Sequence, residues 1–322
     1  MRLELVQQEA IAIYKTLLTN ENQFERQGTE MSDAVTATFG VTDADLLGSG
    51  WESTIYALGT TQILRIPRPK AGSEDQVRAQ AAFTANLPPL PFAVPCIREI
   101  SRIDGQLYVI EDRIAGQSMA ALLPKLSGER RATALRAYLA AAEAMSAAAA
   151  PGEAFGDLLL DQPRRCDKWS DYLIARVRKA AADDVLAAAI PDLAGIVERF
   201  TARLEAIPDP ARCIVHGDFW PPNVMMNDDL QVTGLIDFSF TTRIGDHVMD
   251  LAGACHFLLA TKSSSQADHD YLKQLILAKQ GAEVIDRIGL YAVWFAFDFA
   301  FNHDDAAVFA WCTNLIRDFA SN

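Results

Sequence analysis

The first third of the chain alternates hydrophobic and polar residues over short runs, and glycine-containing turns separate these runs. Such alternation is typical of strands with one buried face, and short glycine turns join antiparallel neighbours. The runs predict a five-stranded antiparallel sheet, with three strands in 44–66 and one each in 97–102 and 106–111. Helical spacing predicts a leading helix at 3–19 and a second helix at 73–87, before the fourth strand.

After Gly116 the hydrophobic spacing becomes helical almost throughout, apart from one short β-type stretch. The change near 112–117 predicts two lobes, 1–115 with the sheet and 116–322 with most of the helices. The predicted fold class is therefore α+β and bilobal. Because ligand pockets favour the interfaces between domains, a ligand is expected in the cleft between the lobes.

Composition limits the class of partner. The chain has 322 residues, of which 50% are hydrophobic, so each lobe can bury a core. A net charge of −13 disfavours nucleic acids and anionic membranes, and it suits a cationic small molecule. No apolar run approaches the roughly 18 residues that span a bilayer. Five scattered cysteines predict reduced thiols, and we expect a cytoplasmic monomer or homodimer.

The candidate chemistry lies in the segment His216-Gly217-Asp218-Phe219-Trp220-Pro221-Pro222-Asn223. Asn223 follows Asp218 by five residues, and Asp237 follows Asn223 by fourteen. This spacing is typical of kinase-type phosphoryl transfer, in which one Asp accepts the proton of the attacking hydroxyl and an Asn and a second Asp hold Mg²⁺. Mg²⁺ prefers oxygen ligands, which Asn223 and Asp237 supply. Each residue alone is also an ordinary turn former, so the prediction depends on the whole set.

These motifs resemble those of the aminoglycoside phosphotransferase (APH) family, small-molecule kinases with a protein-kinase-like fold. The resemblance rests on His216-Gly217-Asp218, Asn223, Ile236-Asp237-Phe238, Gly245-Asp246 and Asp250-Leu251-Ala252, and it extends over about residues 41–260. It implies a nucleoside triphosphate co-substrate, ATP or GTP, together with Mg²⁺. It also implies that His216, Asp246 and Asp250 support the loops rather than react.

The N-terminal half supplies the residues expected to bind the nucleotide. Gly48, Ser49 and Gly50 form a turn whose backbone amides can close over phosphates. The backbone of a hinge at 108–113, which includes Glu111 and Arg113, is expected to contact the purine.

The phosphate-gripping pair departs from the usual kinase pattern. Kinases place a Lys on the third strand and a Glu on the following helix, whereas this chain has Arg65 and Gln80. Arg65 keeps its charge and can bind two phosphate oxygens. Gln80 can accept a hydrogen bond but adds no countercharge, and Arg68 with Glu74 is an alternative pair.

The acceptor site is expected near the C-terminus. The run from Leu290 to Phe301 is apolar on every side except at Asp298, so this carboxylate either is paired in the core or faces a cavity. Helical spacing places Trp294, Asp298 and Asn302 on one side, an arrangement suited to a cationic ligand. The alternative is an Asp298 bound to Arg287 or to a backbone amide.

Two classes of function follow. The first is an ATP- or GTP-dependent O-phosphotransferase acting on an aminoglycoside-like antibiotic, with a macrolide or a choline- or amino-sugar-type metabolite as other acceptors. The second is a nucleotide-binding pseudokinase, which the Arg65 and Gln80 departures favour and the intact Asp218, Asn223 and Asp237 disfavour.

Overall fold

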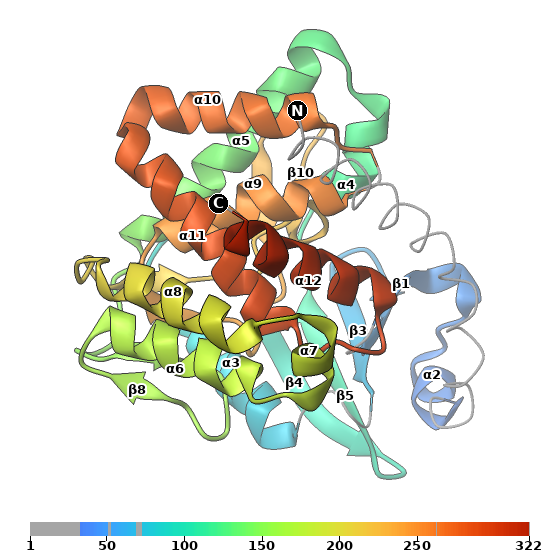
Figure 1. Ribbon diagram of the computed structural model, residues 1–322. Coiled ribbons are helices and arrows are strands. Elements are labelled where there is room, and N and C mark those ends of the chain that lie inside the picture. The colour runs from blue at the N-terminus through green and yellow to red at the C-terminus, as the bar shows by residue number, and fades with distance from the viewer. Residues whose placement is uncertain (1–32, 51–52, 69–72, 262, 322) are drawn as a thin grey trace.

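The computed structural model describes residues 33–50, 53–68, 73–261 and 263–321. The predicted helix at 3–19 and residues 51–52 of the glycine turn lie outside these ranges. The described chain forms a sheet-containing N-terminal lobe and a larger, mainly helical C-terminal lobe (Figure 1). This is the α+β, kinase-like architecture that the sequence predicts.

The N-terminal lobe is a five-stranded antiparallel sheet in the order β1-β2-β3-β5-β4, with helix α3 packed against it. Its elements are α2 (Asp33–Phe39), β1 (Leu46–Ser49), β2 (Ser53–Leu58), β3 (Gln62–Pro67), α3 (Glu74–Ala85), β4 (Ile97–Ile103) and β5 (Gln106–Asp112).

Local sequence explains several of these boundaries. Ser73 and Gln76 form a capping box that starts α3. Asp104 and Gly105 have φ angles of 49° and 82°, which a tight hairpin between β4 and β5 requires. The first strand lies further along than predicted: Leu46 begins β1 rather than ending it, because Asp43–Asp45 form a capped 3₁₀ turn.

The C-terminal lobe packs its helices around short strands. Its elements are β6 (Gln117–Ser118), α4 (Met119–Leu122), α5 (Gly128–Ala144), β7 (Phe155–Asp157), β8 (Arg165–Cys166), α6 (Trp169–Ala181), α7 (Asp184–Ala189), α8 (Leu193–Glu205), β9 (Cys213–Val215), β10 (Val224–Met226), β11 (Val232–Leu235), β12 (Arg243–Gly245), α9 (Val248–His256), α10 (Gln266–Gln280), α11 (Ala282–Phe299) and α12 (Ala306–Ala320).

Helix α11 is the centre of this lobe and contacts α6, α9, α10 and α12 (Figure 1). Its residues 291–298 are all buried, as a helix that is apolar on every side should be. The strands form two small sheets, β11-β10-β6 and β8-β7-β12-β9, which carry the segments with the predicted chemistry.

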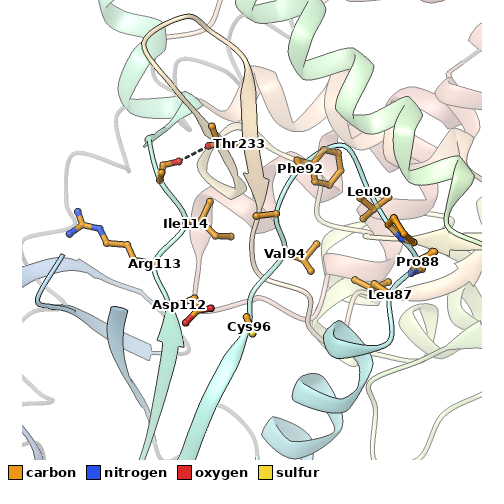
Figure 2. Close-up of a pocket in the computed structure, with 13 residues that line it drawn as sticks. Leu87, Pro88, Leu90, Phe92, Val94, Cys96, Asp112, Arg113, Ile114 and Thr233 are labelled. Atoms are coloured by element: carbon orange, nitrogen blue, oxygen red, sulfur yellow. Dashed lines mark hydrogen bonds between the residues drawn. The ribbon is translucent and has the colours of Figure 1, made fainter. Parts of the chain in front are cut away.

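The two lobes are joined at two places. The chain crosses between them after β5, in 113–116, so most of the predicted hinge lies inside β5. In addition, Ala93 hydrogen-bonds through its backbone to Thr233 and Leu235 on β11. A cavity of about 540 Å³ lies between these junctions, lined by residues 87–90, 92–94, 96 and 112–115 and by Thr233. Figure 2 shows Ile114 directed toward Val94, whereas the Arg113 guanidinium extends away from the apolar side chains.

The structure agrees with some of the remaining expectations from composition and disagrees with others. No helix in the described residues is long and apolar enough to cross a membrane. All five cysteines are free thiols. Cys213, Cys255 and Cys312 are buried in the core as expected, but Cys96 is exposed.

Candidate active site

His216 fixes the segment that carries Asp218. Its side chain is fully buried after β9, its Nδ1 accepts the Asp218 amide at 3.3 Å, and its Nε2 lies 2.9 Å from the Ile236 carbonyl oxygen. A neutral ring with the proton on Nε2 satisfies both contacts. Burial lowers the pKa of His216 to about 4, which keeps this neutral form near pH 7. His216 therefore connects the loop of Asp218 to the strand end before Asp237.

Asp250 holds the same segment from helix α9. Its two carboxylate oxygens accept the backbone amides of His216 and Gly217, each at 2.9 Å. Burial raises the pKa of Asp250 to about 6, and the two amide bonds act in the opposite direction. Gly217 has a φ of 80°, and a Cβ there would lie 2.2 Å from the Thr241 carbonyl oxygen. Only glycine fits this approach of the two loops.

Asn223 connects Asp218 to Ile236, the residue that precedes Asp237. The Asn223 Nδ2 donates to both the carbonyl oxygen and the Oδ2 of Asp218, each at 3.0 Å. The Ile236 amide donates to the Asn223 carbonyl oxygen at 2.9 Å, so Asn223 lies beside the residue that precedes Asp237. Because the Nδ2 of Asn223 donates to Asp218, its Oδ1 is the side-chain atom suited to bind a cation.

The backbone of Asp237 adopts an unusual conformation. Its φ of 69° is left-handed, which Asp tolerates better than most residues and which is common at functional sites. Asp237 is exposed to solvent, although many protein atoms lie nearby. Desolvation by these atoms raises the pKa of Asp237, and the nearby Arg65 cation lowers it.

Asn223 and Asp237 fit a Mg²⁺ ion. A carboxylate and an amide oxygen are the few protein ligands that Mg²⁺ usually takes, the others being phosphate oxygens and water. Among the described residues, no cluster of three or more His, Cys, Asp or Glu side chains could hold a metal ion. The described part of the chain therefore offers no site of the kind that structural zinc uses.

Arg65 is held from two sides on β3. It forms an ion pair with Glu111 of β5, and its Nη2 donates to Gln80 Oε1 of α3 at 3.1 Å. The predicted Gln80 contact is therefore confirmed, and Glu111 supplies the countercharge that Gln80 lacks. The alternative pair is wrong: Arg68 donates to Ser49 Oγ, whereas Glu74 binds Arg78 and Arg102.

For the glycine turn at 48–50 and the hinge at 108–113, the structure gives fewer contacts of the predicted residues. Gly48 and Ser49 lie in β1, and the amide of Gly50 bonds to the Ser53 carbonyl oxygen. The Arg113 amide bonds to the Thr61 carbonyl oxygen, so that amide is engaged within the lobe. Of the predicted site residues only Arg113 lines the cavity in Figure 2, so the residues predicted to bind phosphate and metal do not line it.

The residues predicted for the acceptor belong to the core instead. Trp294 is fully buried, and its Nε1 donates to the Leu173 carbonyl oxygen. Asp298 is paired with Arg176 at 2.5 Å and with Arg243 at 3.2 Å. Of the two expected alternatives, the ion-paired core carboxylate is the correct one.

The predicted partner of Asp298 was also wrong. Arg287 contacts Asp246, whose other oxygen accepts the Val248 amide at the start of α9. Asn302 is half-buried and bonds the carbonyl oxygen of Phe299, which caps the end of α11.

Sequence reasoning missed Glu111 as the partner of Arg65, although a signal for it exists. In the β3–β5 register Arg65 lies opposite Val109 and Ile63 opposite Glu111. Arg65 and Glu111 are therefore diagonal neighbours on one face of the sheet, within reach of long side chains. Pairing β3 with β5 before assigning roles would have revealed the ion pair.

The fold and the site together define a small-molecule phosphotransferase with a protein-kinase-like architecture. The model of the phosphotransferase enzyme (APH) family matches residues 43–286, more than half of the chain. The chain belongs to this family, as the motif resemblance indicated, and it is a phosphotransferase that uses an alcohol group as acceptor. No curated protein sequence matches the chain.

Solved structures share the fold at low sequence identity. An apo structure of a thermostable mutant of aminoglycoside phosphotransferase APH(4)-Ia is 20% identical, with a TM-score of 0.63 over 91% of this chain and 100% of that one. A GDP and kanamycin complex of APH(2″)-IIIa is 15% identical, with a TM-score of 0.58 over 90% and 97%. A macrolide 2′-phosphotransferase type I is 18% identical, with a TM-score of 0.54 over 88% and 94%.

Replacing His216 should flatten the acid dependence of stability. The folded protein keeps the ring neutral down to about pH 4, whereas the unfolded chain takes up a proton below about pH 6.5. His216 therefore contributes stability above about pH 6.5 that is lost as the pH falls toward 4, about 3 kcal/mol in total. Urea unfolding of His216→Asn across this range should show a smaller loss than the wild-type protein.

His247 offers a control of opposite sign. A hydrogen bond to Asp246 raises the pKa of His247, so its contribution is present at acid pH and is lost as the pH rises. His247→Asn should therefore make the loss of stability at falling pH steeper. If the free energy of unfolding falls equally steeply with decreasing pH in the wild-type protein and in His216→Asn, the His216 ring is not held neutral.

Proposed function

We propose that the protein transfers the γ-phosphoryl group of ATP or GTP to a hydroxyl of a small cationic molecule of the aminoglycoside type. The observation that carries this is the contact of the Asn223 amide with the Asp218 carboxylate, beside the strand end that presents Asp237. This contact supports a site in which Asp218 would accept a proton and Asn223 and Asp237 would bind a cation, the arrangement that phosphoryl transfer uses.

Each residue has a separate task. The acceptor oxygen forms a bond to the γ-phosphorus, the bond to the β–γ bridging oxygen breaks, and Asp218 takes the proton of the hydroxyl. Asn223 and Asp237 would hold Mg²⁺, which neutralises charge on the phosphate oxygens when bound. Arg65 would bind phosphate oxygens, and the glycine turn that contains Gly48, Ser49 and Gly50 would lie over them. The backbone near Arg113 would contact the purine.

Two features support a cationic acceptor. The net charge of −13 favours approach of a positively charged molecule. Structural relatives have been solved with ADP and hygromycin B and with GDP and kanamycin, so both nucleotides and aminoglycosides occur among proteins of this fold.

Asn302, at the end of α11, remains the one residue that we retain from the predicted acceptor set.

A macrolide-like acceptor is the second candidate. Phe301, which is 53% exposed, lies with its ring 6.2 Å from that of Phe240, and Phe240 follows Asp237 by three residues. The exposed Phe301, packed on the half-buried Phe240 near Asp237, suits a ligand with an apolar face. The two candidates therefore differ in the kind of contact made beside Asp237.

A nucleotide-release screen tests the proposal. The purified protein is incubated with ATP or GTP, with and without Mg²⁺, and with aminoglycosides, macrolides or small amino alcohols, while ADP or GDP release is followed. We expect Mg²⁺-dependent release with one acceptor class. Phe301→Ala should raise the KM of a macrolide and leave that of an aminoglycoside unchanged. Nucleotide binding without release for any acceptor would favour a pseudokinase.

A further inference from the structure

Gln80 contacts two functional segments at once. Its Oε1 accepts from Arg65 Nη2 at 3.1 Å, and its Nε2 donates to the carbonyl oxygen of Phe238 at 2.5 Å. The orientation of the amide is unambiguous, because a guanidinium can only donate and a carbonyl can only accept. Gln80 therefore connects the phosphate-binding strand β3, through helix α3, to the residue that follows Asp237.

The surroundings of Phe238 make this contact specific. The Phe238 ring packs on Phe83 of α3, with ring centroids 5.9 Å apart, and on His216, at 4.7 Å. Helix α3 thus holds Phe238 by its ring through Phe83 and by its carbonyl through Gln80. A shift of this backbone would move Asp237, whose left-handed conformation depends on its neighbours.

The charge on Arg65 does not need Gln80. Glu111 is buried beside Arg65 and forms the ion pair from the neighbouring strand. In protein kinases a carboxylate on the helix pairs with the strand cation, whereas in this chain that carboxylate lies on strand β5. Glu111 balances the charge of Arg65. Gln80 holds Arg65 and the Phe238 carbonyl in position relative to each other.

We propose that Gln80 is a positioning residue that aligns Arg65 with the Asp237 segment, and that this position requires an amide rather than a carboxylate. The proposal rests on the proposed function. An ionised Glu at this position would still accept from Arg65, but it has no proton to donate to the Phe238 carbonyl. Its second oxygen would face that carbonyl oxygen and add a negative charge near Asp237. Restoring the usual kinase residue should therefore impair the protein.

Nucleotide binding measures this effect without requiring an acceptor. The Kd of AMP-PNP is determined by calorimetry with and without Mg²⁺. Wild-type protein should bind more tightly with Mg²⁺. Gln80→Glu should weaken the Mg²⁺-dependent binding about tenfold, a loss expected for one hydrogen bond near a charged group, and should leave Mg²⁺-free binding unchanged. Glu111→Gln and Arg65→Ala should weaken binding under both conditions.

Gln76→Glu is the matched control on the same helix. The Gln76 Oε1 only accepts, from the Ser73 amide at 3.0 Å, and a carboxylate does this equally well at a helix N-terminus. This variant carries the same charge change and should bind AMP-PNP like the wild-type protein. Gln80→Met, which makes neither contact and adds no charge, replaces Gln80→Glu if that variant does not fold. Because Glu111 still pairs with Arg65, Gln80→Met should weaken Mg²⁺-dependent binding more than Mg²⁺-free binding.

The outcomes separate the two proposals. Wild-type protein that binds AMP-PNP, together with a Gln80→Glu variant that matches it with Mg²⁺, would overturn the role of Gln80 alone. Equal weakening by Gln80→Glu in both conditions would also overturn it, since that result indicates a general loss of structure. A wild-type protein that binds neither AMP-PNP nor its guanine counterpart GMP-PNP would overturn the proposed function and this inference with it.

Discussion

Asp218→Asn should lower kcat by about 10²–10⁴-fold, the contribution of a positioned general base. The substitution removes the proton acceptor but keeps the shape of the side chain. The Asn223 amide, which donates to Asp218 Oδ2 at 3.0 Å, can still donate to a carboxamide oxygen there. Nucleotide affinity should therefore stay unchanged, because Arg65, Asn223 and Asp237 remain. Nucleotide-release assays and AMP-PNP calorimetry measure the two quantities separately.

Asp228→Asn is the matched control for this experiment. Asp228 lies on the exposed turn between β10 and β11, a few residues after the site, and the same chemical change there should leave kcat unaltered. An Asp218→Asn protein with nearly full kcat would exclude Asp218 as the base. A parallel loss of nucleotide affinity would instead assign Asp218 a role in holding the metal or the loop.

The part of the site that the sequence predicts well consists of residues close together in the chain. Asp218 and Asn223 are five residues apart, and their spacing reflects one loop whose geometry does not depend on distant packing. The turn at Asp104-Gly105 is predictable for the same reason, since it depends on the φ angles that these residue types adopt. Arg65 and Gln80 were paired by element order alone, and the structure confirms their contact.

The part that was missed depends on side-chain pairs brought together by the tertiary fold. Glu111 meets Arg65 only through the register of β3 on β5, which hydrophobic alternation does not specify. Arg176 is 122 residues from Asp298, and Arg243 is 55 residues away, so neither is a neighbour by helical spacing. The sequence offered Arg287 as one alternative partner of Asp298, but Arg287 contacts Asp246 instead. A buried charge signals that a partner exists without identifying it.

Asp298→Asn should lower stability rather than acceptor affinity. Asp298 lies between two arginines, and the Arg243 side chain is only 1% exposed. Arg243 also stacks over Trp294, 4.7 Å from the ring centroid, so it cannot move toward water without opening the core. Removing the shared carboxylate charge leaves two buried cations together, which should cost about 3–5 kcal/mol. Urea unfolding measures this loss.

Asp304→Asn is a suitable control, because Asp304 is exposed just after α11 and its neutralisation should leave the free energy of unfolding nearly unchanged. A second test replaces the arginine instead: Arg176→Met leaves the Asp298–Arg243 pair in place and should cost less than Asp298→Asn. Since Asp298 has no free face toward a ligand, any folded Asp298→Asn protein should keep the wild-type KM for the acceptor. A variant of normal stability with a raised acceptor KM would return Asp298 to the acceptor site and contradict its role in the core.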